Sequence, residues 1–214
     1  LGLWSRTVMF IVSDHSMATN ERKTSLTEVF TAAGIPSSSY LIVQNGGTNF
    51  VYLAEPSSPE RNDLLRQMRQ AALAADPALG IDEALYRDPN PLDGDTVNTL
   101  DAVHPGWHLA GPRTGDLVVT QTAGGAFTDP IHPVAGGHGG PSTTDNLFTI
   151  TGGWKGIAKN GALAGQPGPR FDDTGLNPTQ AENVDVAATA MRLLGQQPPR
   201  DNQGRVLTEA FKGW

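Results

Sequence analysis

Three residues of the sequence have the chemistry of divalent-metal ligands. Asp14 and His15 are adjacent and follow an apolar run over residues 7–12, and His138 stands among four glycines at 136–140. A carboxylate oxygen and an imidazole nitrogen are the usual pair of ligands for zinc or manganese. The glycines on both sides of His138 free the backbone to bring its imidazole close to a ligand. Taken singly, each element also has a simpler interpretation: a strand-end Asp that caps a turn, and a His in a flexible loop.

The other histidines point less directly to a site. His104 and His108 bracket Pro105-Gly106-Trp107. Because a proline and a glycine between them disfavour a helix, we interpret this pair as turn residues. His132 precedes a proline in the same loop as His138, either lining the mouth of the site or facing solvent.

The sequence lacks the residues or motifs that several other kinds of functional site require. The chain has no cysteine, so disulfides and thiolate metal sites are excluded. It has no Gly-x-Ser-x-Gly elbow, no Walker A motif and no dinucleotide-binding glycine pattern. The acidic runs at 93–95 and 172–173 lack the spacing of an EF-hand and are interpreted as solvated turns.

The charge of the chain limits its partners. The formal net charge is −7, which argues against unaided binding to nucleic acid or to an anionic membrane. A small phosphate substrate stays compatible with this charge, because bound metal ions would invert the local field. No apolar stretch approaches 18 residues, so we expect no transmembrane helix, and the first residues do not resemble a signal peptide.

The elements that must position these residues alternate between strand and helix patterns. Strands are predicted at 7–12, 40–43, 49–53, 84–87, 116–122 and 147–151. Helices are predicted after Thr24 or Ser25 as cap, over 59–75, and over 183–194. The second has one apolar face, and the third has an apolar stripe of Val184, Ala187, Ala188, Met191 and Leu194. The runs at 7–12 and 116–122 look like strands buried on both faces, so we expect an α/β fold with a mostly parallel sheet flanked by helices.

In this order along the chain, the motifs resemble the type I phosphodiesterase/nucleotide pyrophosphatase branch of the alkaline-phosphatase superfamily. Residues 7–17 resemble that family's strand ending in Ser-Asp-His-Gly-Met, with Ser16 in place of its glycine. Gly137-His138-Gly139 resembles the later Gly-x-His-Gly element. Further similarity lies in residues 116–119, 147–153, 183–189, 193–195 and 204–207. The match extends over nearly the whole chain, which would form a single C-terminal portion, residues 1–214, an incomplete half of an alkaline-phosphatase-like fold.

The resemblance implies roles for the three ligands. Two divalent ions, most often zinc, with manganese or calcium as alternatives, would clamp the phosphate of a phosphodiester or nucleotide substrate. Asp14 and His15 would bind one ion and His138 the other. The family's nucleophile and its remaining ligands precede the Ser-Asp-His strand, so this chain alone is expected to be inactive. Residues 88–113, with Trp107, are interpreted either as a substrate-side insertion or as a packed surface loop.

Besides such an enzyme, two other functions stay open. The chain is either a truncated homologue that acts as a binding or structural module, or part of a phosphatase or sulfatase of the same superfamily. Relatives of this kind are usually exported, which implies an extracytoplasmic location. Because half a sheet leaves an unpaired edge strand, at residues 7–12, we also expect self-association or pairing with an N-terminal half of the same protein.

Overall fold

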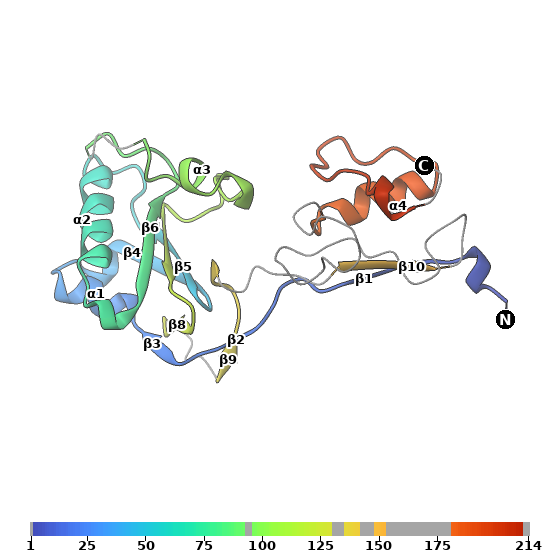
Figure 1. The fold of residues 1–214 in the computed structure, drawn as a ribbon. Coiled ribbons are helices and arrows are strands. Elements are labelled where there is room, and N and C mark those ends of the chain that lie inside the picture. Colours follow the sequence, from blue (N-terminus) through green and yellow to red (C-terminus); the bar gives the residue numbers. More distant parts are fainter. Residues whose placement is uncertain (1, 93–95, 130–134, 142–147, 153–180, 212–214) are drawn as a thin grey trace. The chain divides into compact units, whose positions relative to one another are not determined.

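The computed structural model describes residues 2–92, 96–129, 135–141, 148–152 and 181–211. The chain divides into two compact units, named here the central and the terminal unit (Figure 1). The central unit is Met17–Thr143, and the terminal unit combines Leu1–Ser16 with Thr144–Trp214. The terminal unit is therefore assembled from both ends of the sequence. Among the described helices, none has the length and apolar character needed to cross a bilayer.

A four-stranded antiparallel sheet, in the order β4-β5-β7-β6, forms the centre of the central unit. Its strands are β4 (Tyr40–Asn45), β5 (Thr48–Leu53), β6 (Ile81–Tyr86) and β7 (Leu117–Gln121). β4 and β5 form a hairpin around Gly46 and Gly47, and Gly46 takes the positive φ of 61° that such a turn favours. Two short ladders complete the unit. One pairs β2 (Ala18–Thr19) with β9 (Gly136–Gly137), and the other pairs β3 (Arg22–Thr24) with β8 (Gly125–Phe127).

Helices cover both faces of this sheet. They are α1 (Leu26–Ala32), α2 (Arg61–Leu73) and α3 (Leu100–Val103), with 3-10 turns at Ser37–Ser39, Pro77–Leu79 and Pro105–Trp107. α1 and α2 lie along one face of the sheet (Figure 1), where Leu117 and Val119 pack against them. Val118 points to the other face and packs with Leu100. The predicted apolar face of α2 is confirmed, with Leu65, Met68 and Ala72 buried.

The prediction of a mostly parallel sheet is wrong for the described residues. β5, β6 and β7 pair antiparallel, and only β3 and β8 run parallel. The run Leu117–Gln121 is buried throughout, as expected. Its burial results from cover on both faces by α1, α2 and α3. A continuous apolar strand therefore indicates that both faces are covered, and does not give the direction of its neighbours.

Two buried carboxylates fasten the central unit. Asp116, whose side chain is 6% exposed, accepts hydrogen bonds of 3.1 Å from both Arg61 and Arg87. Its other oxygen accepts from the backbone N–H of Leu53 at 3.0 Å. The carboxylate thus joins α2, β5 and the end of β6 at the start of β7. Since each of its oxygens is paired, its burial is compensated.

Asp129 plays the second anchoring role, at the start of α1. Its carboxylate accepts from the backbone N–H groups of Leu26 and Thr27 and from the Ser25 hydroxyl, the last at 2.8 Å. Ser25 is itself the predicted cap and accepts from the N–H of Glu28. A carboxylate at a helix N-terminus satisfies unpaired N–H groups and is stabilised by the helix dipole. Asp129 thereby ties the segment after β8 to α1.

The terminal unit contains β1 (Val8–Val12) and β10 (Phe148–Gly152), paired antiparallel, with helix α4 (Asp185–Leu193) and 3-10 turns at Trp4–Arg6 and Thr208–Ala210. The predicted strands are confirmed. Burial of β1 on both faces is not found, because Val8 and Phe10 pack into the core whereas Met9 and Ile11 are 41% and 45% exposed. The core is closed by the buried residues Ile150, Ala181, Leu207, Ala210 and Phe211.

The buried stripe of α4 differs from the predicted one. Of the five stripe residues only Ala188 is buried, and it is joined by the polar residues Asp185 and Thr189. Asp185 accepts from the N–H of Arg205 at 2.7 Å, and Thr189 accepts from the N–H of Leu207 at 3.0 Å. These side chains satisfy the backbone of the segment that packs on the helix. The apolar pattern predicted the wrong face of α4, because Asp185 and Thr189 are buried through hydrogen bonds.

Candidate metal centre

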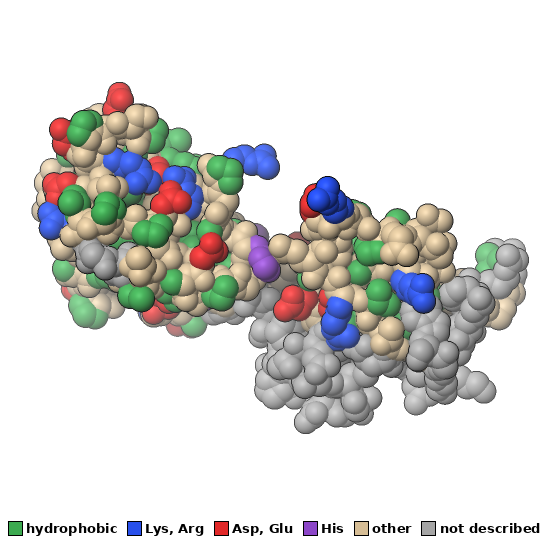
Figure 2. Space-filling view, turned by 90° about the horizontal axis from the view of Figure 1, so that it is seen from above, with side chains coloured by type: hydrophobic (Ala, Val, Ile, Leu, Met, Phe, Trp, Pro, Cys, Tyr) green, Lys and Arg blue, Asp and Glu red, His purple; other side chains and the backbone are tan. Residues whose placement is uncertain are grey.

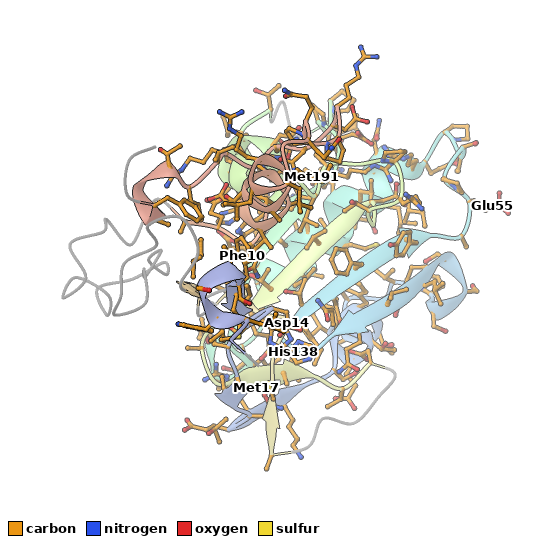
Figure 3. The ribbon with its side chains drawn as sticks, turned by 90° about the vertical axis from the view of Figure 1, so that its right-hand side faces the viewer. Phe10, Asp14, Met17, Glu55, His138 and Met191 are labelled. Atoms are coloured by element: carbon orange, nitrogen blue, oxygen red, sulfur yellow. The ribbon has the colours of Figure 1, made fainter. Side chains whose placement is uncertain are left out.

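Asp14, labelled in Figure 3, and the adjacent His15 follow the end of β1, in the terminal unit. The Nδ1 atom of His15 lies 2.9 Å from the carbonyl oxygen of Ser16. Because a carbonyl oxygen can only accept, Nδ1 carries the hydrogen. The other ring nitrogen, Nε2, lies 3.3 Å from Oδ2 of Asp14. The two side chains therefore converge through one nitrogen and one oxygen.

This arrangement is the one expected of a metal-binding histidine. In metal sites the non-ligating ring N–H usually donates to a carbonyl or carboxylate, which fixes the ring and directs the second nitrogen at the ion. With Nδ1 protonated, a neutral ring turns a lone pair toward the Asp14 carboxylate. The 3.3 Å between Nε2 and Oδ2 is a separation at which both atoms can bind one ion. The side chains are 31% (His15) and 87% (Asp14) exposed, so an ion can reach them from solvent.

Asn183 holds this loop from the opposite end of the sequence. Its Nδ2 donates to the carbonyl oxygens of Ser13 at 3.0 Å and of Asp14 at 3.3 Å. The residue stands just before α4, so the helix and the loop of the candidate ligands are joined by one amide. Sequence reasoning included Asn183 only as part of a helix. A contact over 169 or 170 positions leaves no local signal in one sequence.

His138 belongs to the central unit and follows directly on β9. Its carbonyl oxygen accepts a hydrogen bond from the N–H of Gly47, at 3.3 Å, in the β4–β5 turn. Gly139 has a φ of 86°, so the predicted need for glycine is confirmed at this position. Figure 3 labels His138 and Asp14, which lie in different units. Within the described ranges, no three Asp, Glu or His side chains converge as a metal-binding group.

Residues 88–113 contribute to the second face of the central sheet. The rings of Trp107 and His104 stack with centroids 3.7 Å apart, and His104 Nε2 lies 2.7 Å from a carboxylate oxygen of Glu83. Both histidines of this stretch lie at turns, as predicted, and His108 has a positive φ of 52°. His132, the other secondary candidate, lies outside the described residues.

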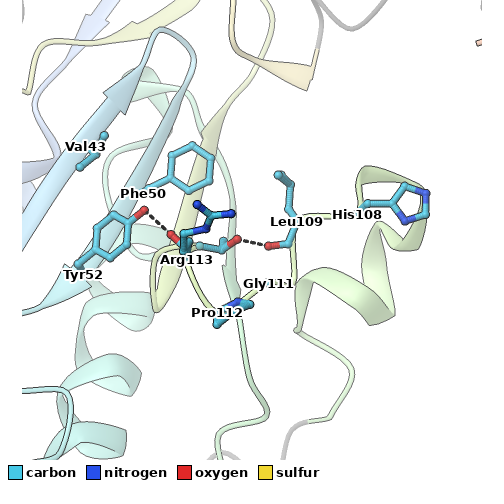
Figure 4. A pocket seen from close by; sticks show the side chains of 9 residues that line it. Val43, Phe50, Tyr52, His108, Leu109, Gly111, Pro112 and Arg113 are labelled. Atoms are coloured by element: carbon cyan, nitrogen blue, oxygen red, sulfur yellow. Dashed lines mark hydrogen bonds between the residues drawn. The ribbon is translucent and has the colours of Figure 1, made fainter. Parts of the chain in front are cut away.

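A groove of about 470 Å³ lies beside this stretch (Figure 4). It is formed by the exposed faces of β4 and β5 and by the loop from His108 to Thr114. The Tyr52 hydroxyl donates to the carbonyl of Arg113 at 2.9 Å, and the Thr114 hydroxyl donates to that of Leu109. Trp107 packs against the buried residues Leu85, Leu100 and Val118 and is not among the residues that line the groove. If this region forms a substrate wall, Tyr52 and Arg113 are better placed to touch a ligand than Trp107.

The charged side chains are dispersed. On the face seen in Figure 2, Lys and Arg alternate with Asp and Glu among apolar and neutral groups, without a large patch of one sign. A polyanion such as nucleic acid would need a basic stripe.

The comparison with protein families decides the relationship. Residues 1–145 match the family described as type I phosphodiesterase / nucleotide pyrophosphatase. The chain belongs to this family. Asp14, His15 and His138 all lie within the matched residues, and the predicted resemblance is confirmed. No curated protein matches the chain.

Two solved structures with TM-scores above 0.5 show the same kind of fold. Human ectonucleotide pyrophosphatase / phosphodiesterase 5 is 15% identical, with a TM-score of 0.51 over 74% of this chain and 36% of its own. The murine protein of the same name is 14% identical, with the same TM-score and coverage. Phosphonoacetate hydrolase from Sinorhizobium meliloti 1021 is 12% identical, with a TM-score of 0.48 over 67% of this chain and 36% of its own. The chain thus spans about a third of the length of these proteins.

Proposed function

We propose that this chain is part of a metal-dependent phosphodiesterase or nucleotide pyrophosphatase, in which Asp14 and His15 bind one divalent ion and His138 binds a second. The observation that carries the proposal is the Asp14–His15 pair. The Ser16 carbonyl fixes the His15 ring, and Nε2 and Oδ2 converge at 3.3 Å, within the residues that match the family. A borderline nitrogen beside a hard oxygen suits zinc, with manganese or calcium as alternatives.

The ligands on this chain would form parts of two metal sites. When bound, such ions neutralise phosphate charge and activate the attacking oxygen. The chain's own residues hold the ligands in place: Ser16 orients the His15 ring, and Asn183 fixes the loop that carries Asp14. Two ligands at one ion and one at the other would bind zinc weakly, since even a catalytic zinc site has three protein ligands. The proposal therefore assigns the nucleophile and the remaining ligands to other parts of the full-length protein.

The proposed substrate is a phosphodiester of nucleotide type. An inactive variant of the murine ectonucleotide pyrophosphatase / phosphodiesterase 5 was solved in complex with AMP. With a net charge of −7, this chain would attract an anion mainly through the bound ions. An extracytoplasmic location belongs to the same proposal and is supported by family membership alone.

The assay that tests this function compares three chromogenic substrates. The full-length protein, loaded with zinc, is given a bis-nitrophenyl phosphodiester, nitrophenyl phosphate and nitrophenyl sulfate. We expect the diester to have the highest kcat/KM, and His138→Ala and Asp14→Ala to lower it by at least about 100-fold, because loss of a ligand should cost at least as much as the roughly 10- to 100-fold loss typical of outer-shell partners. Faster turnover of the monoester or sulfate would favour a phosphatase or sulfatase. No turnover of any substrate would favour a non-catalytic binding module.

A further inference from the structure

The turn between β4 and β5 lies against the backbone of His138. Gly46 accepts a hydrogen bond from the N–H of Phe127 at 2.9 Å, and Gly47 accepts one from the N–H of Gln121 at 2.9 Å. The N–H of Gly47 points the other way and donates to the carbonyl of His138 at 3.3 Å. The turn is therefore bonded to β7 and β8 and, at the same time, to the segment of the proposed ligand.

The two backbones are too close for side chains between them. A Cβ atom added at Gly46 would overlap the carbonyl oxygen of His138, and one added at Gly139 would overlap the carbonyl oxygen of Asn45. A Cβ at Gly47 would lie 2.8 Å from the Cα of Gly140, closer than real Cβ contacts. Glycine is required at these positions because backbone meets backbone.

The central sheet holds the β4–β5 turn in place through strand pairing. β4 and β5 pair along their whole length, from Tyr40 with Leu53 to Asn45 with Thr48, and β5 pairs with the fully buried β7. The Gln44 side chain adds a hydrogen bond to the carbonyl of Phe127. His138, by contrast, follows a strand of only two residues, β9. The turn is thus the point at which a rigid sheet contacts a segment with little regular structure of its own.

We infer that the turn Asn45-Gly46-Gly47 positions His138 for metal binding, by holding its backbone against the central sheet. The inference rests on the proposed function, since it gives a role to the neighbour of a proposed ligand. None of the three turn residues needs to touch the ion. Their effect is on the geometry of one ligand and on the metal site that this ligand completes.

A pair of glycine variants tests this role in the full-length protein. Gly34 and Gly46 both have a positive φ, of 78° and 61°, so Ala at either position strains the backbone. A Cβ at Gly34 meets no atom within 4 Å, whereas one at Gly46 overlaps the His138 carbonyl. We expect Gly46→Ala to weaken zinc binding about 10- to 100-fold, the range found for outer-shell partners of metal ligands. Gly34→Ala should leave zinc affinity unchanged.

The readout is zinc titration by calorimetry, with the melting temperature recorded for each variant. Activity of Gly46→Ala should return at high zinc concentration, a rescue that a merely unfolded variant does not show. If Gly46→Ala does not fold, Gly47→Ala, with its milder close contact, replaces it with the same expectation. Wild-type zinc affinity in the folded Gly46 or Gly47 variant would overturn the inference.

His138→Ala separates this inference from the function on which it rests. If His138→Ala weakens zinc binding but the turn variants do not, the positioning role is wrong and the metal site stands. If His138→Ala itself binds zinc like the wild type, the proposed ligand is wrong and the positioning role is overturned with it.

Discussion

The proposed ligands are held in two different ways. Asp14 and His15 lie in a loop whose carbonyls are bound by one distant side chain, the amide of Asn183. His138 lies in a segment whose backbone is packed against the backbone of the β4–β5 turn. The first contact depends on the presence of an amide, and the second on the absence of side-chain atoms.

This difference predicts opposite sensitivities. Truncating Asn183 should loosen the Asp14–His15 loop, whereas enlarging Gly46 should displace His138. The two regions also differ in the structure that carries them. The β4–β5 turn is part of a four-stranded sheet that Asp116 and Asp129 anchor, whereas β1 pairs with one described strand. A substitution that destabilises the central sheet should therefore displace His138 more than Asp14 and His15.

The largest expected effect comes from Asp116, which anchors the central sheet at the start of β7. Asp116→Ala leaves Arg61 and Arg87 without their buried partner, and removal of one member of a buried ion pair costs about 3–5 kcal/mol. Asp88→Ala is the matched control, because Asp88 pairs with the same two arginines but is 55% exposed, and an exposed pair contributes less than about 1 kcal/mol. Urea unfolding measures both. Equal losses would show that Asp116 is not the anchor.

Asp129→Ala should have the next largest effect. It removes a carboxylate that accepts from two N–H groups at the start of α1, and loss of a helix cap costs about 1–2 kcal/mol. Glu28→Ala, in the same helix, is the control, because the Glu28 carboxylate is not the cap that these N–H groups use. Thermal unfolding of both variants is the measurement. A wild-type melting temperature for Asp129→Ala would contradict the role assigned to this residue.

Asn183→Ala should act on the Asp14–His15 end alone. Without the amide, the carbonyls of Ser13 and Asp14 lose their donor, so we expect zinc affinity to fall about 10-fold, at the low end for outer-shell partners. Gln197→Ala, at an exposed position beyond α4, is the control. The full-length protein with His138→Ala gives the sharper test, because its remaining zinc binding should depend more strongly on Asn183. Unchanged zinc affinity both in the wild-type protein and in His138→Ala would show that Asn183 does not position the Asp14–His15 loop.

The smallest expected effect is a pH dependence in α2. Hydrogen bonds from Arg66, and then Gln67, hold the pKa of Asp63 below its ordinary value of 3.8. The lowered pKa stabilises the folded state above pH 3.8, and this contribution is lost as the pH falls through the folded-state pKa. Asp63→Asn should therefore weaken the loss of stability below that pH, without a change in zinc affinity. Urea unfolding at pH 6 and pH 3 is the comparison, and an identical acid loss in both proteins would contradict it.

Much of the fold was predictable because its signals are local. The hairpin at Gly46-Gly47, the Ser25 cap and the apolar face of α2 each depend on residues within a few positions of one another. The direction of the strands was not predictable, since a buried strand looks alike in either kind of sheet. The polar face of α4 was missed because Asp185 and Thr189 are buried only through bonds to residues 205 and 207.

The candidate site shows the same limit. Asp14, His15 and His138 stand out as residue types, and their order along the chain led to the family that the comparison confirms. The residues that hold these ligands in place do not stand out in the sequence. Asn183 contacts Ser13 across 170 positions, and Gly47 contacts His138 across nearly half the chain. Such contacts depend on tertiary structure, which a single sequence does not reveal.

The most direct test of the proposed metal ligands is the anomalous scattering of zinc in crystals of the full-length protein. We predict one zinc peak about 2.0–2.1 Å from Nε2 of His15, with a carboxylate oxygen of Asp14 as a second ligand, and another at the same distance from a ring nitrogen of His138. Zinc bound at other residues, with these three side chains away from every peak, would contradict the account.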